Sequence, residues 1–522
     1  MSDVTTIEAD VPERYAEAVS IRLRRALEED VVGRIWRKDG TLWAPEGTPE
    51  VTNRLGWLDI ADREREQLDT YKAFADGLRA EGYRDAVVLG MGGSSLAPEV
   101  FRQSFGKLDP GLTLHVLDST HPHQVREVLN SIDLDRALMI VSSKSGGTIE
   151  PMSMFKAFSA RQGDGSHFAA VTDPGSGLEA LAGEHGFRQV FHGDPDIGGR
   201  YSALSPFGLV PAVAAGIDIG AVLDSAIGAA EECRVEGGGN AGLWLGCALG
   251  ELARQGRNKL TFVADAPFTS YGIWAEQLFA ESTGKLGTGI LPIADEPLLA
   301  PEAYGEDRVF VHIAAGDADN AAKLAALKDA GNPVITIHAV GLADLGRIFY
   351  LSEFAVAVAG WALEINPFDQ PNVQEAKDNT NRVLKDGSGE IDNGALRELT
   401  GGLEPPAYFA IMGYLPYSAE TEAAIARLRE ALIERYHVAT TWGYGPRFLH
   451  STGQFHKGGP KTGRFLQLID EPAEDLEIPG EPYTFATLIR AQADGDLQTL
   501  RNHGLPAVRI SVGDIDAIKE QL

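Results

Sequence analysis

A run of hydroxyl-bearing and glycine residues, SSKSGGT at residues 142–148, has the composition of a phosphate-binding loop. It follows an apolar segment and precedes a helix-like one, so its hydroxyls and free N–H groups converge on one helix N-terminus. A generic Ser/Gly loop that only caps the helix has the same composition, and this segment alone does not separate the two. The candidate phosphate ligands are Ser143, Lys144, Ser145 and Thr148.

A second glycine-rich loop, GMGGSS at residues 90–95, follows the apolar segment at 86–89. Dinucleotide-binding loops require G-x-G-x-x-G, but Ser95 stands where the third glycine belongs, and no acidic ribose partner marks the next strand end. We therefore favour anion binding by Gly93 and Ser94 at a helix N-terminus over a dinucleotide site. Two such loops at neighbouring strand ends favour one shared ligand crevice.

The elements that must hold these loops alternate between short apolar runs and helix-like segments, which is the pattern of parallel-sheet βα units. The first series of expected strands comprises residues 86–89, 112–117, 137–141 and 168–171. The second follows the glycine-rich stretch at 237–239 and comprises 259–264, 308–313 and 334–338. The sequence thus predicts two α/β units in tandem.

The two ends of the chain differ from this middle part. Residues 1–75 show helix-like apolar spacing at 14–29 and 63–78 without a strong strand signal, so we expect a helical cap. From about residue 401, the candidates are strands at 408–414, 465–469 and 507–512 and a helix at 419–436. That region is a third α/β unit or an extension of the second. The expected domains are residues 1–75, 76–235, 236–400 and 401–522.

The bulk composition, 44% hydrophobic and 23% charged, is typical of folded soluble proteins. A formal net charge of -29 opposes nucleic-acid binding, which needs a basic surface, but it does not exclude a small phosphorylated ligand. There is no run of 18 apolar residues, the N-terminus is acidic and unlike a signal peptide, and only two cysteines occur. We expect a cytoplasmic protein with no membrane or nucleic-acid partner.

Five sequence blocks occur in the order and approximate spacing of the glucose-6-phosphate isomerase family. They are GMGGSSLAP, SSKSGGT, GGRYSALSPFGL, QLFAESTGK and NPFDQPNVQEAK. The resemblance spans residues 85 to about 377 and is closest to the isomerase half of bifunctional transaldolase/isomerase proteins. It implies an α/β fold in which two doubly wound parallel-sheet sugar-isomerase (SIS) domains in tandem lie between the helical N-terminal cap and an α/β C-terminal extension. It also implies a sugar-phosphate substrate, no metal or organic cofactor, and a homodimer.

Enzymes of that family interconvert D-glucose 6-phosphate and D-fructose 6-phosphate through a cis-enediol, moving a proton between carbons 2 and 1. One carboxylate with a pKa near the working pH can do this. The resemblance assigns the base to Glu281 in QLFAESTGK, and Gln277, four residues earlier, shares its helix face and can position the substrate. It also assigns Arg200 in GGRYS to the negative charge that develops on the enediolate.

The substrate enters mainly as a closed ring, so a donor and an acceptor are needed at the ring oxygen and the anomeric hydroxyl. The resemblance assigns Lys377 to ring opening. Pro371 suits a helix start, which predicts substrate-binding Gln370 in the preceding loop and Lys377 in the second helical turn. This block departs from the commoner family pattern at Asn372, which replaces Gly, and at Gln374, which replaces Glu.

A ring-opening histidine has no counterpart where the resemblance would place it, some tens of residues after the base. The segment RFLHSTGQFHKGG at residues 447–459 echoes the missing block. We therefore expect His450 or His456 to fold back and supply the imidazole.

Two other functions remain open. One is an isomerase of the same fold that also accepts mannose 6-phosphate. The other is a non-catalytic sugar-phosphate sensor, which would keep the phosphate loops but would have no need for Glu281, Arg200 and Lys377 together.

Overall fold

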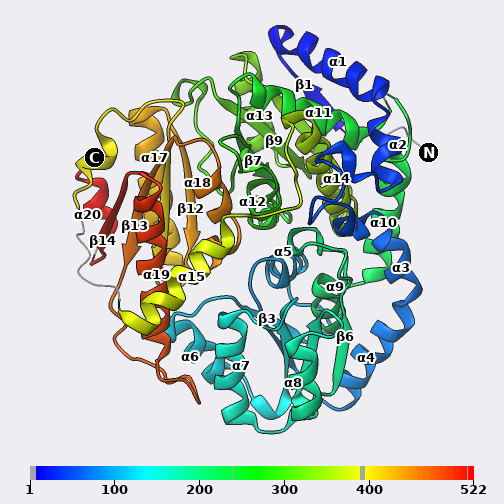
Figure 1. Cartoon of the computed structure of the whole chain (residues 1–522), viewed down its shortest axis with the longest axis vertical. Helices are drawn as coiled ribbons and strands as arrows, with labels where there is room; N and C mark the ends of the chain where they lie inside the picture. Colours follow the sequence, from blue (N-terminus) through cyan, green and yellow to red (C-terminus); the bar gives the residue numbers. More distant parts are fainter. Residues whose placement is uncertain (1–6, 238, 388–393, 514) are drawn as a thin grey trace.

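The computed structural model describes residues 7–237, 239–387, 394–513 and 515–522, and its strands form three sheets (Figure 1). In the first sheet all strands are parallel, in the order β3-β2-β4-β5-β6. They are β2 (Asp85–Leu89), β3 (Thr113–Leu117), β4 (Ala137–Ser142), β5 (Phe168–Thr172) and β6 (Gln189–His192). Strands β4 and β5 are buried throughout, as expected when helices cover both faces of a parallel sheet. The helices of this part are α5 (Leu96–Phe105), α6 (Pro122–Ser131), α7 (Ile149–Gln162), α8 (Gly177–His185) and α9 (Pro206–Ala214).

The second sheet has the order β1-β10-β9-β7-β8, and only its edge strand β1 runs antiparallel. Its strands are β1 (Ile7–Asp10), β7 (Lys259–Ala264), β8 (Leu291–Ile293), β9 (Arg308–Ala314) and β10 (Val334–His338). The helices of this part are α10 (Ile219–Glu232), α11 (Ala241–Arg254), α12 (Tyr271–Thr283), α13 (Ala318–Asp329) and α14 (Leu345–Leu363). The two expected series of parallel strands, and with them the α/β fold class, are confirmed.

The C-terminal region has a parallel sheet of its own, in the order β12-β11-β13-β14. Its strands are β11 (Tyr408–Tyr414), β12 (Ala439–Tyr444), β13 (Gly463–Ile469) and β14 (Ala507–Ser511). Its helices, with α15 leading in from the second part, are α15 (Val373–Asp386), α16 (Arg397–Thr400), α17 (Ala419–Tyr436), α18 (Gly453–Gly458), α19 (Phe485–Asn502) and α20 (Ile515–Lys519). In Figure 1 this sheet stands beside both other parts, which meet to its right. The exact domain boundaries stay a prediction.

All three sheets share one winding. Numbered from the first parallel strand of each, the spatial order is 2-1-3-4, and the first sheet adds a fifth strand. In this arrangement the chain changes its winding direction between the first and third strands. A crevice therefore opens at the carboxyl ends of those two strands, where doubly wound proteins bind ligands.

The N-terminal region is mostly helical, and it also contains one strand, for which its pattern gives no strong signal. Its helices are α1 (Glu13–Glu28), α2 (Val31–Trp36), α3 (Ile60–Glu66) and α4 (Leu68–Ala80), so the helix expected at 63–78 is interrupted at Gln67. Strand β1, with the sequence IEAD, was missed because it is a short, half-exposed edge strand with little apolar character. Helix α1 packs on α11 and α4 packs on α9, so this region covers parts of both neighbouring units.

Helix α14 is apolar on all sides and lies at the centre of the second unit, packed against α10, α11 and α12. Every one of its residues except Arg347 is buried, as is usual for a helix without a polar face. Gly246 of α11 allows close packing, since a Cβ there would lie 2.4 Å from the carbonyl oxygen of Ala355. Of the helices within the described ranges, none is both long and apolar enough to cross a membrane.

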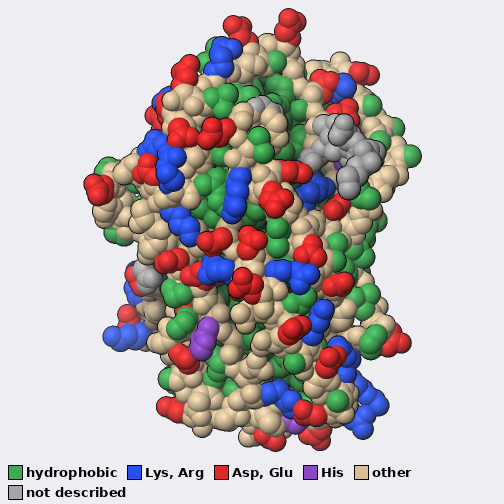
Figure 2. Space-filling view, turned by 90° about the vertical axis from the view of Figure 1, so that its right-hand side faces the viewer, with side chains coloured by type: hydrophobic (Ala, Val, Ile, Leu, Met, Phe, Trp, Pro, Cys, Tyr) green, Lys and Arg blue, Asp and Glu red, His purple; other side chains and the backbone are tan. Residues whose placement is uncertain are grey.

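The surface carries a large surplus of carboxylates, with a formal net charge of -29. On the face shown in Figure 2, acidic and basic side chains are interspersed. Exposed ion pairs of this kind contribute on the order of 0–1 kcal/mol each to stability. The overall surplus of negative charge raises the local concentration of small cations around the molecule.

Candidate active site

A cavity of about 450 Å³ opens at the carboxyl ends of β2 and β4, the first and third strands in the winding of the first sheet. The loops after both strands line it, and so do parts of α12, the segment leading into α15, and the turn before α18. The predicted residues on its wall are Gly93, Ser94, Ser143, Lys144, Ser145, Thr148, Gln277, Glu281, Gln370, Lys377 and His450. The two glycine-rich loops therefore do share one crevice.

The loop after β4 folds onto the N-terminus of α7 through its own hydroxyls. Ser143 Oγ accepts a hydrogen bond from the backbone N–H of Gly146 at 3.2 Å and donates to Thr148 Oγ1 at 3.4 Å. Ser145 Oγ accepts from the backbone N–H of Gly147 at 3.2 Å. These N–H groups are capped only by neutral oxygens, which phosphate oxygens can replace with a stronger, charge-assisted bond.

Lys144 is held at the wall of the cavity by contacts outside its own loop. Its Nζ lies 2.5 Å from Asp173 Oδ2 and donates to the backbone carbonyls of Asp194 and Pro195, each at 3.3 Å. Its ammonium group is thus fixed beside the phosphate loop, but its charge is shared with Asp173. A phosphate bound there would compete with that carboxylate for the ammonium group.

The glycines of the loop after β2 let four chain segments meet. A Cβ on Gly93 would lie 2.0 Å from the carbonyl oxygen of Gly199. Gly92 has φ +54°, and a Cβ there would lie 2.8 Å from Gln277 Nε2 and 3.1 Å from the carbonyl oxygen of His450. Side chains at either position would push the loop away from its neighbours, so glycine is required by close approach as well as by conformation.

Glu281 lies on α12, a helix buried along nearly its whole length, and only 4% of its surface is exposed. Burial raises the pKa of its carboxyl group, although Arg200 and His450 oppose this. Gln277, one turn earlier, donates from Nε2 to Glu281 Oε2 at 3.4 Å, and its own Oε1 is buried without a hydrogen-bond partner. A carboxylate with a raised pKa is suited to accept and return a proton near neutral pH.

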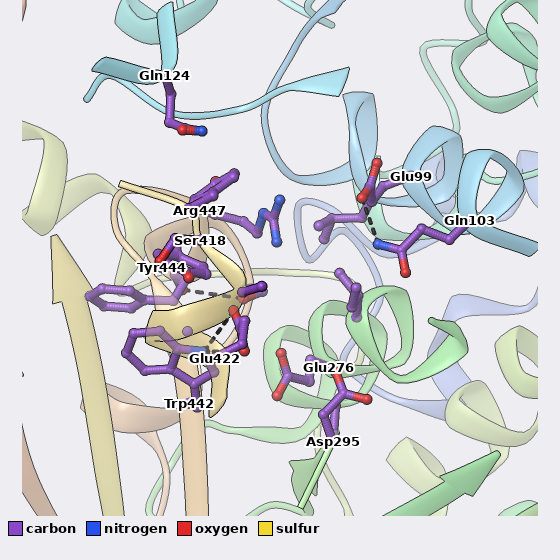
Figure 3. A pocket seen from close by; sticks show the side chains of 18 of the residues that line it. Glu99, Gln103, Gln124, Glu276, Asp295, Ser418, Glu422, Trp442, Tyr444 and Arg447 are labelled. Atoms are coloured by element: carbon purple, nitrogen blue, oxygen red, sulfur yellow. Dashed lines mark hydrogen bonds between the residues drawn. The ribbon is translucent and has the colours of Figure 1, made fainter. Parts of the chain in front are cut away.

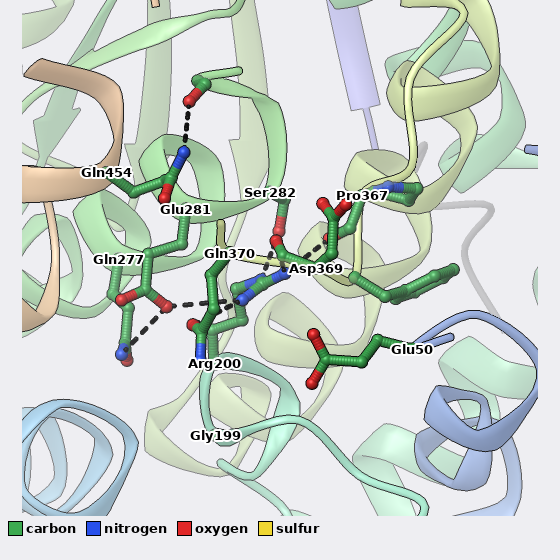
Figure 4. A network of polar contacts seen from close by, with 12 residues as sticks. Glu50, Gly199, Arg200, Gln277, Glu281, Ser282, Pro367, Asp369, Gln370 and Gln454 are labelled. Carbon is green, nitrogen blue, oxygen red and sulfur yellow. Dashed lines mark hydrogen bonds and ion pairs between the residues drawn. The ribbon is translucent and has the colours of Figure 1, made fainter. Parts of the chain in front are cut away.

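Arg200 lies behind the cavity wall and contacts the base directly. Its Nη1 is 3.5 Å from Glu281 Oε2 and 3.1 Å from Gln370 Oε1, and its Nε donates to Ser282 Oγ at 2.9 Å (Figure 4). Its Nη2 donates to the backbone carbonyls of Pro367 and Asp369. The guanidinium is therefore fixed by several partners next to the carboxylate, rather than projecting into the open cavity.

Lys377 lies in the second turn of α15, as predicted, with its side chain exposed on the cavity wall. Gln370 lies in the loop before this helix and also lines the cavity. A smaller adjoining cavity is lined by Lys377, Thr148 and His450. The three segments that carry these residues therefore converge at one rim of the site.

His450 is the histidine that reaches the active-site cavity. It closes the short turn Arg447–His450, and its Nε2 lies 3.0 Å from Glu150 Oε1. The same oxygen accepts from Gln492 Nε2 at 2.7 Å. Burial would raise the pKa of Glu150, but His450, a backbone hydrogen bond and the charge of Lys377 together outweigh this and the pKa is lowered, so the carboxylate stays ionised. An ionised carboxylate only accepts hydrogen bonds, which makes Nε2 the protonated nitrogen and leaves Nδ1 for other partners.

The expectation that His456 could supply the ring-opening imidazole is corrected by the structure, because its ring does not reach the cavity. It is buried on α18, where its Nδ1 is hydrogen-bonded to Tyr408 Oη at 2.9 Å and its ring stacks on that tyrosine. Burial, followed by the charge of Lys457, lowers its pKa to about 3, so the imidazole stays neutral. A polar, glycine-rich sequence surrounds both histidines, and nothing in it indicates which ring points outward.

Sequence reasoning missed Glu150, which holds His450, and Gln492, which is hydrogen-bonded to the same oxygen of Glu150. Glu150 is the second residue of α7, two positions after Thr148, so its place at a loop beside an expected ligand was a usable signal. Gln492 lies in the middle of α19, 342 positions after its partner Glu150. No pattern in the sequence connects it to this site.

Comparisons with known proteins show which sequences this chain is similar to. A family model described as phosphoglucose isomerase matches residues 60–230. The glucose-6-phosphate isomerase of Rubrobacter xylanophilus is 30% identical over 441 residues, covering 72% of this chain and 97% of that protein. That of Leptospira biflexa is 29% identical over 396 residues, covering 63% of this chain and 86% of the relative.

Solved structures show the same fold at lower identity. A glucose-6-phosphate isomerase from Chlamydia trachomatis superimposes with a TM-score of 0.63 at 18% identity, covering 74% of this chain and 89% of that one. A hypothetical protein from Thermus thermophilus does so with a TM-score of 0.60 at 24% identity, covering 72% of this chain and 100% of that one. At these identities the likeness concerns the fold.

Proposed function

Because this chain belongs to the phosphoglucose isomerase family, we propose that it interconverts D-glucose 6-phosphate and D-fructose 6-phosphate. The observation that carries the proposal is Glu281, a buried carboxylate with a raised pKa on the wall of a cavity that two anion-binding loops also line. The family membership supplies the reaction, and the cavity supplies the groups that the reaction needs.

Substrate binding begins with the phosphate in our proposal. The group lies at the N-terminus of α7, held by Ser143, Ser145, Thr148 and backbone N–H groups, with Lys144 beside it. The Ser94 side chain and the Gly93 backbone close the other side of the crevice. A phosphate fixed there leaves the sugar chain to extend toward Glu281 and Gln277 on α12, which line the same cavity.

Proton transfer is assigned to Glu281. It removes the proton from carbon 2 and returns it to carbon 1 through a cis-enediol, and the reverse reaction uses the same carboxylate. Arg200 acts through its contact with Glu281, keeping the carboxylate in place and offsetting negative charge as the enediolate forms. Gln277 has an unsatisfied Oε1 in this cavity, which is available to accept a hydrogen bond from a substrate hydroxyl.

Ring opening is assigned to His450, oriented by Glu150, with Lys377 at the same rim. The hydrogen bond between Nε2 and Glu150 leaves Nδ1 as the nitrogen that can exchange a proton with the sugar ring. Gln370 lies between Arg200 and the cavity and supports the substrate from the opposite side.

The proposal is tested by comparing Glu281→Gln with Glu28→Gln, a control with the same charge change at an exposed position on α1. We expect Glu281→Gln to lower kcat by about 10³-fold, within the usual range for a general base, and to stop deuterium incorporation at carbons 1 and 2 in D₂O. NMR follows both. Near-normal turnover in Glu281→Gln would contradict the mechanism, and tight binding without any exchange in the unaltered protein would favour a sensor.

Finer properties of the protein are also proposed. A coupled assay with mannose 6-phosphate tests whether the second aldose phosphate is accepted.

We propose a cytoplasmic homodimer that does not bind nucleic acid, as the family resemblance and the net charge of -29 favour. Sedimentation velocity tests the dimer. The closer relation to the isomerase half of bifunctional transaldolase/isomerase proteins stays a prediction.

A further inference from the structure

A second cavity, of about 550 Å³, lies where the three parts of the molecule meet (Figure 3). Its wall is formed by α5 of the first part, by α12 and the end of β8 of the second, and by the start of α17 and the end of β12 of the third. Helix α12 separates it from the active site: Glu276 lines this cavity, and the next residue, Gln277, lines the other. No step of the proposed isomerase reaction uses this space.

Carboxylates dominate the charge of this cavity. Its acidic wall residues are Glu99, Glu127, Glu276, Asp295 and Glu422. The two wall arginines already have partners. Arg447 donates to both carboxylate oxygens of Asp118, at 2.7 and 2.9 Å, and Arg429 donates to the backbone carbonyls of Ala294 and Asp295. Arg102 pairs with Glu99 at 2.7 Å, and the charge of Arg429 acts on Glu276 and Asp295, so the acidic surplus of the wall is only partly balanced.

Glu276 is the wall residue that points most directly to a cationic ligand. Only 9% of its surface is exposed, and its Oε1 is buried without a hydrogen-bond partner. Burial, followed by the neighbouring Asp295, raises its pKa to about 8, and burial raises the pKa of Asp295 to about 6, with Arg429 opposing this rise and Glu422 adding to it. Figure 3 shows the Glu276 and Asp295 side chains close together on one side of the cavity. The backbone of Ala294 gives Glu276 one hydrogen bond, but Oε1 has none, and a carboxyl group with this pKa holds its proton at neutral pH. A cation placed between the two carboxyl groups would favour their ionised forms and supply the missing partner.

Aromatic rings line the side of the cavity opposite Glu276 and Asp295. Trp442 and Tyr444 have ring centroids 4.8 Å apart, and Tyr417 packs on Tyr444 at 4.2 Å. Trp442 Nε1 donates to Glu422 at 3.2 Å, so a carboxylate is held beside the indole. Ammonium groups on short alkyl chains are bound by this combination, with carboxylates for the charge and ring faces for the methylenes.

We propose that this cavity binds an aliphatic polyamine, a chain with two or more ammonium groups separated by methylenes. Its volume falls in the range of small-molecule sites. An extended cation of this kind can reach Glu276 and Asp295 with one ammonium group and Glu422 with another. A metal ion fits less well, because no cluster of three or more metal-ligating side chains occurs within the described ranges. The net charge of -29 further favours a cationic ligand.

The test is isothermal titration calorimetry of the full chain with spermidine, at an ionic strength of about 150 mM so that loose surface association is screened. We expect one-to-one binding. Glu276→Gln should weaken it about ten- to hundred-fold, since it removes a charged hydrogen-bond acceptor. Glu422→Gln, at an exposed position that folding tolerates, should weaken it less, and the matched control Glu28→Gln should leave it unchanged.

Other outcomes would overturn the proposal. These are the absence of binding at millimolar spermidine, several weak sites in place of one, or equal binding by the Glu276, Glu422 and Glu28 variants. A parallel titration with MgCl₂ distinguishes the class of cation. Tight Mg²⁺ binding that is lost in Glu276→Gln and that displaces spermidine would assign the site to a divalent metal. If Glu276→Gln does not fold, Glu422→Gln decides alone.

Discussion

The first and second sheets share one winding but use the crevice that it creates in opposite ways. In the first sheet, the loops after β2 and β4 leave a cavity of about 450 Å³. In the second sheet, the corresponding place between β7 and β9 is filled by the carboxylate of Asp265. Its Oδ2 accepts hydrogen bonds from the backbone N–H groups of residues 315–317, at 2.8–3.0 Å.

This difference shows that the winding supplies the crevice, whereas individual residues decide whether it can bind a ligand. Both crevices present backbone N–H groups at the start of a helix, α7 in the first sheet and α13 in the second. At α13 an internal carboxylate satisfies these groups permanently. At α7 only serine hydroxyls do so, and these are neutral and can be displaced. The same backbone arrangement therefore serves as an internal brace in one sheet and as an anion site in the other.

Each crevice also contains an acid–histidine pair. Glu150 and His450 meet at 3.0 Å on the wall of the first crevice, where His450 borders the cavity. Asp265 and His312 meet at 2.8 Å in the second, where both residues are buried. The contact distances are similar, so access to the cavity distinguishes a pair that can act on substrate from a pair that stabilises the fold.

The largest expected effect is the difference in kcat between substitutions of these two histidines, His450 and His312. We expect His450→Asn to lower the kcat of the folded protein by about 10²- to 10⁴-fold, because it removes a proton donor and acceptor from an open wall. It also removes a partner of the buried Glu150, so a lower Tm accompanies the loss of activity. His312→Asn should lower Tm and leave the kcat of the folded protein close to that of the unaltered chain, because it removes a buried partner of Asp265. Steady-state kinetics and thermal unfolding check both. The reverse result would show that access to the cavity does not distinguish the two acid–histidine pairs.

The next largest effect concerns Asp265 itself. We expect Asp265→Asn to destabilise the protein by about 3 kcal/mol, since several buried hydrogen bonds lose their charged acceptor. Asp329→Asn, at an exposed position at the end of α13, is the matched control and should have little effect. Urea unfolding measures the difference. Equal stability of the two variants would mean that Asp265 is not an internal brace.

The pH dependence of this brace follows from the same carboxylate. Burial raises the pKa of Asp265, but hydrogen bonds from Asn320, His312 and the backbone lower it to about 2, below the value of about 3.9 for an unfolded aspartate. Its contribution is therefore fully present above about pH 4 and is lost as the pH falls through the folded pKa. Acid unfolding should show this loss in the unaltered chain, and Asp265→Asn should lack it.

A smaller effect is expected at the close approach of two active-site loops. Gly93→Ala places a Cβ 2.0 Å from the carbonyl oxygen of Gly199, which should cost about 1–3 kcal/mol and displace the loop that closes the phosphate crevice. We expect KM for the sugar phosphate to rise. Gly77→Ala, on α4 with nothing within 4 Å of the added Cβ, is the control and should be neutral or slightly stabilising. An unchanged KM in Gly93→Ala would contradict the close packing.

The smallest effect tests the anion site directly. Inorganic phosphate at ten times its Kd should stabilise the protein by about 1.4 kcal/mol if it binds only the folded state. Thr148→Val, at the start of α7, should reduce this gain, whereas Asp265→Asn should keep it, because the phosphate belongs in the first crevice. Thermal unfolding with and without phosphate measures both. Loss of the gain in Asp265→Asn would place phosphate in the second crevice.

Much of the architecture could be predicted from local patterns. The strands that were predicted correctly, such as β4 and β5, are buried on both faces and so read as continuous apolar runs. Those that were missed have weaker patterns: β1 is an edge strand of four half-exposed residues, and β8 has only three residues. Strands β6 and β12 were missed as well: β6 has four residues with one of them buried, and in β12 the half-buried Trp442 and Gly443 interrupt the buried run. Local pattern fails where a strand is short or only partly covered.

The chemical inventory of the site was largely determined by the sequence alone. The loops SSKSGGT and GMGGSS, the pair Gln277 and Glu281, and Lys377 after Gln370 were all named from residue type and spacing or from resemblance, and the structure brings them to one cavity. These residues could be predicted from the sequence because each group lies within a short, contiguous segment next to a strand end or a helix start.

Only the tertiary structure decided which residues from distant parts of the chain join these loops and side chains at the cavity. His450 and His456 lie in the same loop-rich segment, yet one ring borders the cavity and the other is stacked on Tyr408 in a core. Glu150, which holds His450, and Gln492, which is hydrogen-bonded to Glu150, lie on different sheets' helices. Their meeting depends on how the C-terminal sheet packs against the first, and such packing leaves no local pattern in the sequence, because the partners lie far apart in the chain: 300 positions separate Glu150 from His450, and 48 separate Tyr408 from His456.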